Sequence, residues 1–248
     1  MNVYPLEIRY PFQRTETAIY PALIKQNAEL ILVDCGYAGF LPLIEEAMQV
    51  QGLSLSELTS IIITHHDIDH VGGLFEIKQA YPHVKVYASE TEAPYISGTK
   101  KSLRLQQAEA IHNSLPEDQQ QGALAFQERL KGILPVPVDE TFPNDAPLPF
   151  LEGVEVIATP GHMPGHISLY VKPRKTLIAA DAVVVQDGEL EIANPRFTMD
   201  MQQAIDSIKK LAQLEIETLI CYHGGVVAHD VNAKLKKLIA KYNHTIAQ

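Results

Sequence analysis

The stretch Thr64-His65-His66-Asp67-Ile68-Asp69-His70 follows directly on three isoleucines, Ile61–Ile63. Residues 58–63 (LTSIII) predict a fully buried strand, so three histidines and two aspartates stand at the carboxyl end of a core strand. The neighbouring sequence offers no Lys or Arg to pair with them, and burying such groups unpaired is strongly destabilising. Cations bound between them would neutralise this crowding. The stretch therefore predicts a metal site.

Three more predicted strands, at 154–159, 175–180 and 217–222, are also followed by residues of metal-ligand type. Side chains at the carboxyl ends of strands can converge from distant parts of the sequence. Imidazole and carboxylate are ligands that zinc, iron and manganese accept. Seven ligands are too many for one catalytic ion with an open position, so we expect two ions and a bridging carboxylate. The predicted ligands are His65, Asp67, Asp69, His70, His162, Asp181 and His223.

The order of the predicted elements indicates the fold. Strands at 17–24 and 29–34 come first, βα units follow, including a helix at about 71–81, and strands and βα units return after residue 149. This order favours an α/β (α+β) fold with two sheets packed face to face and helices outside, a four-layer αββα sandwich. We expect one domain over residues 1–248.

Residues 89–149 carry a different pattern, with Gln-rich helices predicted at 102–115 and 117–132. These helices offer too little apolar surface for a core of their own, which predicts a helical insertion that caps the site. Their apolar side chains could line an acyl pocket, form the seam of a homodimer, or pack onto the domain. The side chains concerned are Leu103, Leu105, Ile111, Leu124 and Phe126.

Composition excludes several classes of protein. The 30 acidic residues outnumber the 20 basic ones, for a net charge of −10, which argues against a nucleic-acid partner. The sequence has no apolar run near the ~20 residues that cross a bilayer, and its N-terminus has no signal-peptide pattern. Two cysteines are too few for a disulfide framework. We expect a cytoplasmic protein with a small-molecule substrate and no membrane partner.

The motifs together resemble the metallo-β-lactamase fold superfamily. Its Thr-His-x-His-x-Asp-His loop stands at Thr64–His70, its later pieces at Gly161-His162, Asp181 and His223-Gly224, and its strand-ending Asp-x-Gly at 34–36. The resemblance covers nearly the whole chain except residues 89–149. It implies that Asp34 buttresses the site and that the protein is a metal-dependent hydrolase.

The chain departs from this pattern at Asp67, where the superfamily normally has the second histidine of the loop; His66 stands one position early. The chain is similar here to flavodiiron proteins, which have an acidic residue at this position and hold a di-iron centre. That analogy implies one ion at His65, Asp67 and His162, another at Asp69, His70 and His223, with Asp181 shared. An added carboxylate shifts preference from zinc toward iron or manganese. Alternatively, Asp67 does not bind, which leaves one tight and one weak site.

The predicted function is hydrolysis of a small-molecule ester, lactone, thioester or phosphoester through a metal-bridging hydroxide. The cofactors would be two divalent ions, with zinc first and iron or manganese as alternatives. Asp69 would orient the hydroxide or accept its proton. His166 would contact a developing oxyanion, support a metal ligand from behind, or bond to a neighbouring loop. Two alternative functions are a di-iron redox enzyme and a catalytically weak metal-binding protein.

Overall fold

Two β-sheets pack face to face in the computed structural model, which describes residues 1–12, 15–143 and 145–246. The first sheet has the order β1 (Asn2–Pro5), β4 (Ala22–Gln26), β5 (Glu29–Val33), β6 (Ser60–Ile63), β7 (Lys85–Ser89) and β8 (Glu140–Phe142). The second has the order β15 (Gly225–Val227), β14 (Thr218–Cys221), β11 (Thr176–Ala180), β10 (Ile167–Val171) and β9 (Val154–Ala158). Two hairpins complete the strands, β2 (Ile8–Phe12) with β3 (Thr15–Ile19) and β12 (Val184–Gln186) with β13 (Glu189–Glu191).

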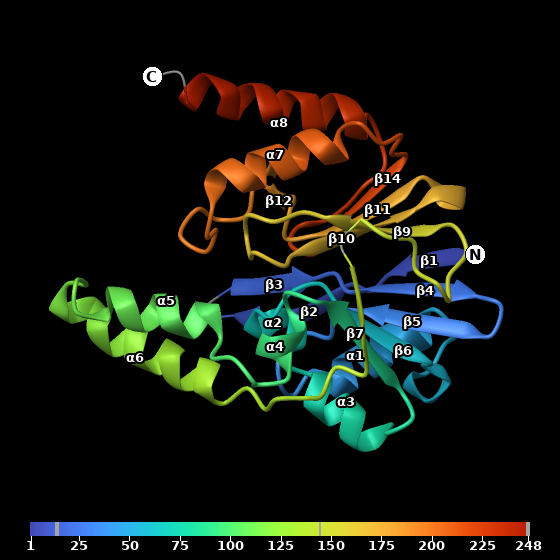
Figure 1. Cartoon of the computed structure of the whole chain (residues 1–248), viewed down its shortest axis with the longest axis horizontal. Helices are drawn as coiled ribbons and strands as arrows, with labels where there is room; N and C mark the ends of the chain where they lie inside the picture. The colour runs from blue at the N-terminus through green and yellow to red at the C-terminus, as the bar shows by residue number, and fades with distance from the viewer. Residues whose placement is uncertain (13–14, 144, 247–248) are drawn as a thin grey trace.

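Helices cover the outer faces of the two sheets (Figure 1). On the first sheet lie α1 (Leu41–Val50) and α3 (Leu74–Ala80), and on the second lie α7 (Met201–Leu211) and α8 (Val231–Ile246). The remaining helices are α2 (Ile68–Val71), α4 (Ala93–Ile96), α5 (Leu103–His112) and α6 (Glu117–Lys131). None of the described helices is both long and apolar enough to pass through a bilayer.

Three hydrophobic cores hold these layers together. The central core lies between the sheets, where Ile62 of the first sheet and Ile178 of the second are both buried. A second core joins the first sheet to α1 and α3, and a third joins the second sheet to α7 and α8. Each sheet is therefore apolar on both faces, as strands inside a layered sandwich must be. The predicted four-layer αββα fold is confirmed.

Two predicted elements are divided in the structure. The strand predicted at 17–24 is interrupted at Tyr20-Pro21, where proline cannot donate a ladder hydrogen bond, so β3 and β4 belong to different sheets. The helix predicted at 71–81 begins earlier and breaks at Gly72-Gly73 into α2 and α3. The first of these two pieces carries Asp69 and His70.

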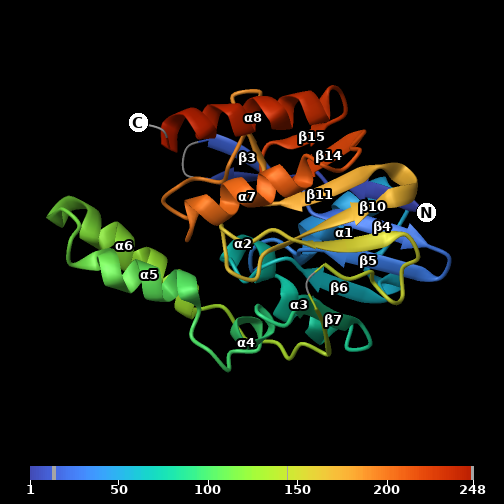
Figure 2. The same cartoon turned by 45° about the horizontal axis from the view of Figure 1, so that its top comes forward.

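The segment between β7 and β8 contains α4, α5 and α6. Helices α5 and α6 form a pair that projects from one end of the sandwich (Figures 1 and 2). Leu105, Ala108 and Leu130 form a small core between them, and Ile68 of α2 packs against it. This contact joins the helical pair to the loop that bears the histidines.

Candidate metal centre

The predicted ligands stand just beyond strand ends, as the sequence requires. His65 follows β6, His162 follows β9, Asp181 follows β11, and His223 follows β14. Adjacent strands β5, β6 and β7 are parallel, and so are β11 and β14, so their carboxyl ends meet at shared edges. The two sheets therefore bring their polar loops to one end of the sandwich.

Glycines fix the loops that carry His162 and His223. Gly161 has φ 135° and Gly224 has φ 91°, values that L side chains rarely adopt. A Cβ on Gly161 would lie 2.3 Å from the backbone nitrogen of Ala204, and one on Gly224 would lie 2.2 Å from the carbonyl oxygen of Val185. Both turns therefore need glycine for their conformation and for close packing.

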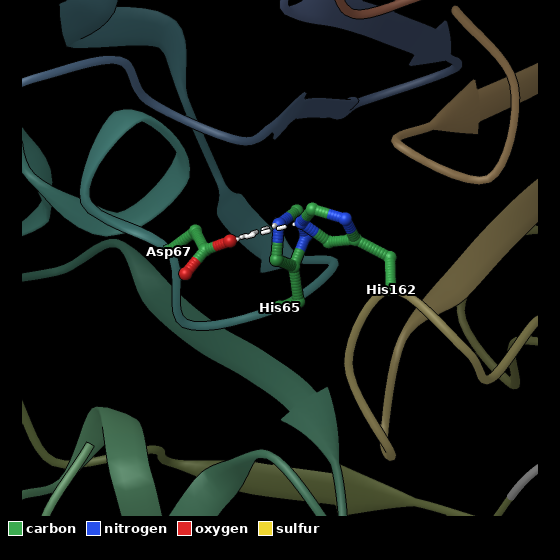
Figure 3. A group of neighbouring side chains, drawn as sticks. All are labelled: His65, Asp67 and His162. Carbon is green, nitrogen blue, oxygen red and sulfur yellow. Dashed lines mark hydrogen bonds and ion pairs between the residues drawn. The ribbon is translucent and has the colours of Figure 1, made fainter. Parts of the chain in front are cut away.

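The seven predicted ligands come together in three overlapping groups, whose ligand atoms lie within 4.8 Å of one another. In the first, the rings of His65 and His162 face the Asp67 carboxylate, with their Nε2 atoms 3.6 and 2.9 Å from Oδ2 (Figure 3). The second contains His65, His70 and Asp181. The third contains Asp69, His70 and His223, in which the Nε2 of His223 lies 3.1 Å from Asp69 Oδ2.

Asp181 lies between the groups. Its Oδ1 is 3.3 Å from His70 Nε2, and its Oδ2 is 3.6 Å from the Nε2 atoms of both His162 and His223. A carboxylate with ligands of different groups around its two oxygens can bridge two ions. The predicted roles of these residues as ligands stay predictions, but their positions are compatible with them.

Several of these ligand atoms have no hydrogen-bond partner, which also fits a metal site. His65 Nε2, His70 Nε2 and Asp181 Oδ1 are buried and have no hydrogen-bond partner among the described residues. Such atoms are costly in a protein interior unless something satisfies them. Imidazole nitrogens and carboxylate oxygens at these separations suit a divalent transition ion. The residues present therefore fit divalent metal.

Hydrogen bonds around the cluster orient two imidazoles. Asp34 Oδ2 lies 2.8 Å from His70 Nδ1 and accepts a bond from Thr64 Oγ1 at 2.7 Å, while Asp34 Oδ1 accepts one from the Thr64 N–H at 2.8 Å. Because the Thr64 hydroxyl donates to Asp34, it is an acceptor for His65 Nδ1 at 3.0 Å. Both Nδ1 atoms thus carry hydrogen, and both Nε2 atoms are directed into the cluster, where they would bind metal.

Asp67 has a partner that the sequence argument missed. Arg104 of α5 donates from Nε to Asp67 Oδ1 at 3.0 Å and from Nη2 to Oδ2 at 2.7 Å, and both residues are buried. The sequence next to the loop offers no Lys or Arg, and the fold supplies one from α5. The useful signal was the uncompensated buried carboxylate itself, which calls for a cation from elsewhere in the chain.

Charge around Asp67 favours its ionised form. Burial by itself would raise the pKa of Asp67, but the nearby His162 and His65 rings and the Arg104 guanidinium outweigh it. They hold the pKa of Asp67 well below its usual range. The residue is therefore a carboxylate, which is the form that can bind metal.

His66 points away from the cluster. Its Nδ1 contacts Glu92 Oε2, its ring stacks on Tyr95 with 4.5 Å between ring centroids, and its Nε2 accepts the Leu103 N–H at 3.2 Å. Glu92 is fully buried and also accepts the His66 N–H at 3.0 Å. The one-residue offset of His66 therefore gives it a structural place between the loop and α5.

His166 uses both ring nitrogens within the protein. Its Nδ1 lies 2.8 Å from Thr159 Oγ1, and its Nε2 accepts the Asp181 N–H at 3.1 Å. Burial lowers the pKa of His166 to about 3, so the ring is neutral. Of its three predicted roles, support of a ligand and bonding to a neighbouring loop match this geometry, whereas contact with an oxyanion would require one of these bonds to break.

The third group attracts cations strongly. Burial alone would lower the pKa of His70 and His223, but Asp181 and other nearby carboxylates outweigh it. The pKa of His70 is well above its usual value and that of His223 is raised to about 10. The carboxylates beside these two rings therefore favour positive charge at this place.

A cavity of about 480 Å³ opens above the cluster. Asp67, Asp69, His162, Asp181 and His223 contribute to its floor. Its walls are mainly apolar and combine both halves of the chain with the helical pair, through Phe12, Tyr37, Ile68, Phe126, Val184, Val185, Ala193 and Phe197. Arg104 and Arg129 add two guanidinium groups. Of the five apolar side chains singled out from α5 and α6, Phe126 lines the cavity, while Ile111 and Leu124 are exposed.

A family model described as the metallo-β-lactamase superfamily matches residues 14–223. The chain belongs to this superfamily. It is 33% identical over 214 residues to the probable metallo-hydrolase YflN of Bacillus subtilis, covering 78% of this chain and 75% of that protein. It is 27% identical to a hydroxyacylglutathione hydrolase of Edwardsiella ictaluri, covering 80% of this chain and 58% of the relative.

Solved structures of the metallo-β-lactamase superfamily share the fold. A family member from Thermus thermophilus superposes with a TM-score of 0.72 at 20% identity, covering 98% of this chain and 79% of that one. A metallo-β-lactamase from Pontibacter korlensis gives 0.66 at 17% identity, with 96% and 94% covered. The resemblance inferred from the motifs is confirmed, and the protein is a metal-dependent hydrolase of this superfamily.

Proposed function

We propose that the protein hydrolyses a small-molecule ester or thioester at a centre of two divalent ions. The observation that carries this proposal is the position of the three ligand groups at the floor of a largely apolar cavity of about 480 Å³. Cavities of this size and character bind small organic molecules and fix them with a few polar groups. The relation to hydroxyacylglutathione hydrolases supports a thioester, while a lactone or phosphoester would be an alternative outcome.

The residues of the cavity divide into two roles in this proposal. Phe126 and Phe197, whose ring centroids are 6.4 Å apart, would hold an apolar acyl group. Arg129 stacks on Phe126 and makes no ion pair with a carboxylate among the described residues. It would bind a carboxylate of the substrate, which fits an acidic acyl or thiol portion.

Asp69 would manage the proton of the attacking water. Its side chain is partly exposed to the cavity, and its carboxylate lies beside His223. Tyr222 donates from its hydroxyl to the Asp69 carbonyl oxygen at 2.5 Å, which fixes the backbone at this point. Divalent ions, when bound here, would supply Lewis acidity and a water of lowered pKa. The Asp69 carboxylate would accept the proton released during attack.

Zinc is the first expectation for the ions, and iron or manganese are alternatives because Asp67 adds a hard oxygen ligand. Metal analysis of protein purified without added metal decides between them.

A homodimer stays a prediction. Its candidate seam is formed by Ile111 and Leu124, which are exposed on the helical pair, and light scattering would measure the mass of the particle. The cytoplasmic location also stays a prediction.

The test is a substrate panel on metal-loaded protein, comprising acyl thioesters, oxygen esters, lactones and phosphodiesters. We expect turnover of thioesters or esters, its loss with Asp69→Asn, and no loss with Asp206→Asn. Asp206 is exposed on α7 and pairs with Lys209, so it makes a matched acid-to-amide control. Turnover of phosphodiesters alone, or oxygen consumption with bound iron and no hydrolysis, would contradict the proposal.

A further inference from the structure

Arg104 is the one guanidinium that touches the candidate ligands among the described residues. Its two hydrogen bonds to Asp67 use both carboxylate oxygens, and the side chains of Arg104 and Asp67 are only 3% and 9% exposed. Nη2 also donates to the Phe197 carbonyl oxygen at 2.6 Å, and Nη1 donates to Gln107 Oε1 at 2.6 Å. The guanidinium is therefore held on several sides, with two acceptors besides Asp67.

Neighbouring residues hold the same two segments together. His66, next to Asp67, accepts the N–H of Leu103, next to Arg104. Ser102 caps the first turn of α5 by accepting the Leu105 N–H. The loop and the start of α5 are therefore fixed at adjacent points. This arrangement presents Arg104 to Asp67 as a built contact, and the exposed lysines nearby, Lys100 and Lys101, take no part in it.

The pair solves a charge problem at the first ligand group. His65 and His162 are the other members, and both offer Nε2 toward Asp67 Oδ2. Asp67 adds a negative charge close to Asp181, whose Oδ2 is 3.6 Å from His162 Nε2. The guanidinium cancels that charge and occupies only part of the oxygens' lone-pair capacity, so Oδ2 can still accept a metal on its other side.

We propose that Asp67 and Arg104 act as one unit, in which a charge-cancelled carboxylate takes the place of a neutral imidazole at the metal centre. Arg104 is thus a positioning residue for a metal ligand, contributed by the helical insertion. This inference rests on the proposed two-ion centre. It predicts that replacing only Asp67 or only Arg104 weakens zinc binding, whereas replacing both together preserves it.

The experiment is a double-mutant cycle read on zinc content and zinc affinity of the purified full chain. The variants are Arg104→Gln, Asp67→His and the double variant Asp67→His with Arg104→Gln. Each single change should weaken the second equivalent of zinc at least tenfold. Arg104→Gln removes the two hydrogen bonds that orient the Asp67 carboxylate, and Asp67→His leaves the Arg104 guanidinium as a buried unpaired cation beside the ion. The double variant should return to within a few-fold of wild type.

Arg129→Gln is the matched control, because it removes a guanidinium from the same cavity that does not contact Asp67. It should leave zinc content unchanged. Circular dichroism identifies a variant that does not fold. If a single variant does not fold, the double variant, which leaves neither charge unpaired, can still be compared with wild type for zinc affinity.

Undiminished zinc binding by Arg104→Gln, or a double variant no better than the weaker single one, would overturn the inference. A wild-type protein that binds only one zinc would overturn it together with the two-ion proposal. Two bound zinc ions without ester or thioester turnover would count against the proposed function alone.

Discussion

Asp34→Asn tests whether the hydrogen bonds behind the ligands control metal binding. The Asp34 carboxylate is acceptor-only and receives three hydrogen bonds, from the Thr64 N–H, the Thr64 hydroxyl and His70 Nδ1, at 2.7–2.8 Å. An asparagine has one acceptor oxygen and one NH₂ group. If the NH₂ replaces Oδ1, it opposes the Thr64 N–H. If it replaces Oδ2, it faces both the Thr64 hydroxyl and His70, so Nδ1 must accept and its proton moves to Nε2, the atom directed at Asp181.

The first orientation disturbs the loop at Thr64 and the second changes the His70 tautomer, so both weaken the two ligand groups that contain His70. Loss of a hydrogen-bond partner behind a ligand typically costs 10–100-fold in metal affinity. This range corresponds to about 1.4–2.7 kcal/mol. We expect zinc affinity to fall by that factor, measured by competition with a chromophoric chelator.

Asp139→Asn is the control for this change. Asp139 also accepts a backbone N–H, that of Val86 at 2.8 Å, but it lies away from the ligand groups. It should leave zinc affinity unchanged. Equal zinc affinity in Asp34→Asn and wild type would refute the proposed fixing of the His70 tautomer.

Three further outcomes are expected. Zinc binding at neutral pH should release protons, because the His223 ring is protonated without metal: carboxylates including Asp181 outweigh burial and raise its pKa to about 10. Zinc affinity should therefore rise with pH, by roughly tenfold per unit for each proton displaced. Titration in weakly buffered solution measures this release, and its absence would contradict the assignment. Cys35 and Cys221 should not react with Ellman's reagent at pH 8 until the protein is denatured, since burial raises the pKa of both thiols. Arg129→Gln should raise KM for carboxylate-bearing substrates more than for uncharged ones, with kcat little changed; equal effects on both would remove Arg129 from substrate binding.

Strong local patterns made most of the fold predictable. Residues 58–63 predicted a core strand, and the structure has a fully buried one at Ser60–Ile63. The β12–β13 hairpin was missed, although Asp187-Gly188 is a typical two-residue hairpin turn and both residues have positive φ. Its strands have three residues each, too few to show a clear alternation.

The candidate site was predictable where each ligand follows a strand, and less so where partners depend on tertiary contact. His162, Asp181 and His223 stand at strand ends that sequence patterns reveal. Arg104 is one of 20 basic residues and lies in a polar segment beside two exposed lysines. Its burial arises from packing of α5 against a loop 37 residues earlier. No local pattern distinguishes it.

The three ligand groups have a consequence for how the protein acquires metal during synthesis. Each group contains at least one residue from the second sheet's loops, namely His162, Asp181 or His223. Ribosomes deliver the histidine-rich loop first, because translation proceeds from the N-terminus. The growing polypeptide thus carries the four ligands of this loop for some time before any of the three ligand groups is complete. Ion capture should come late in biogenesis, after the second sheet has emerged and docked.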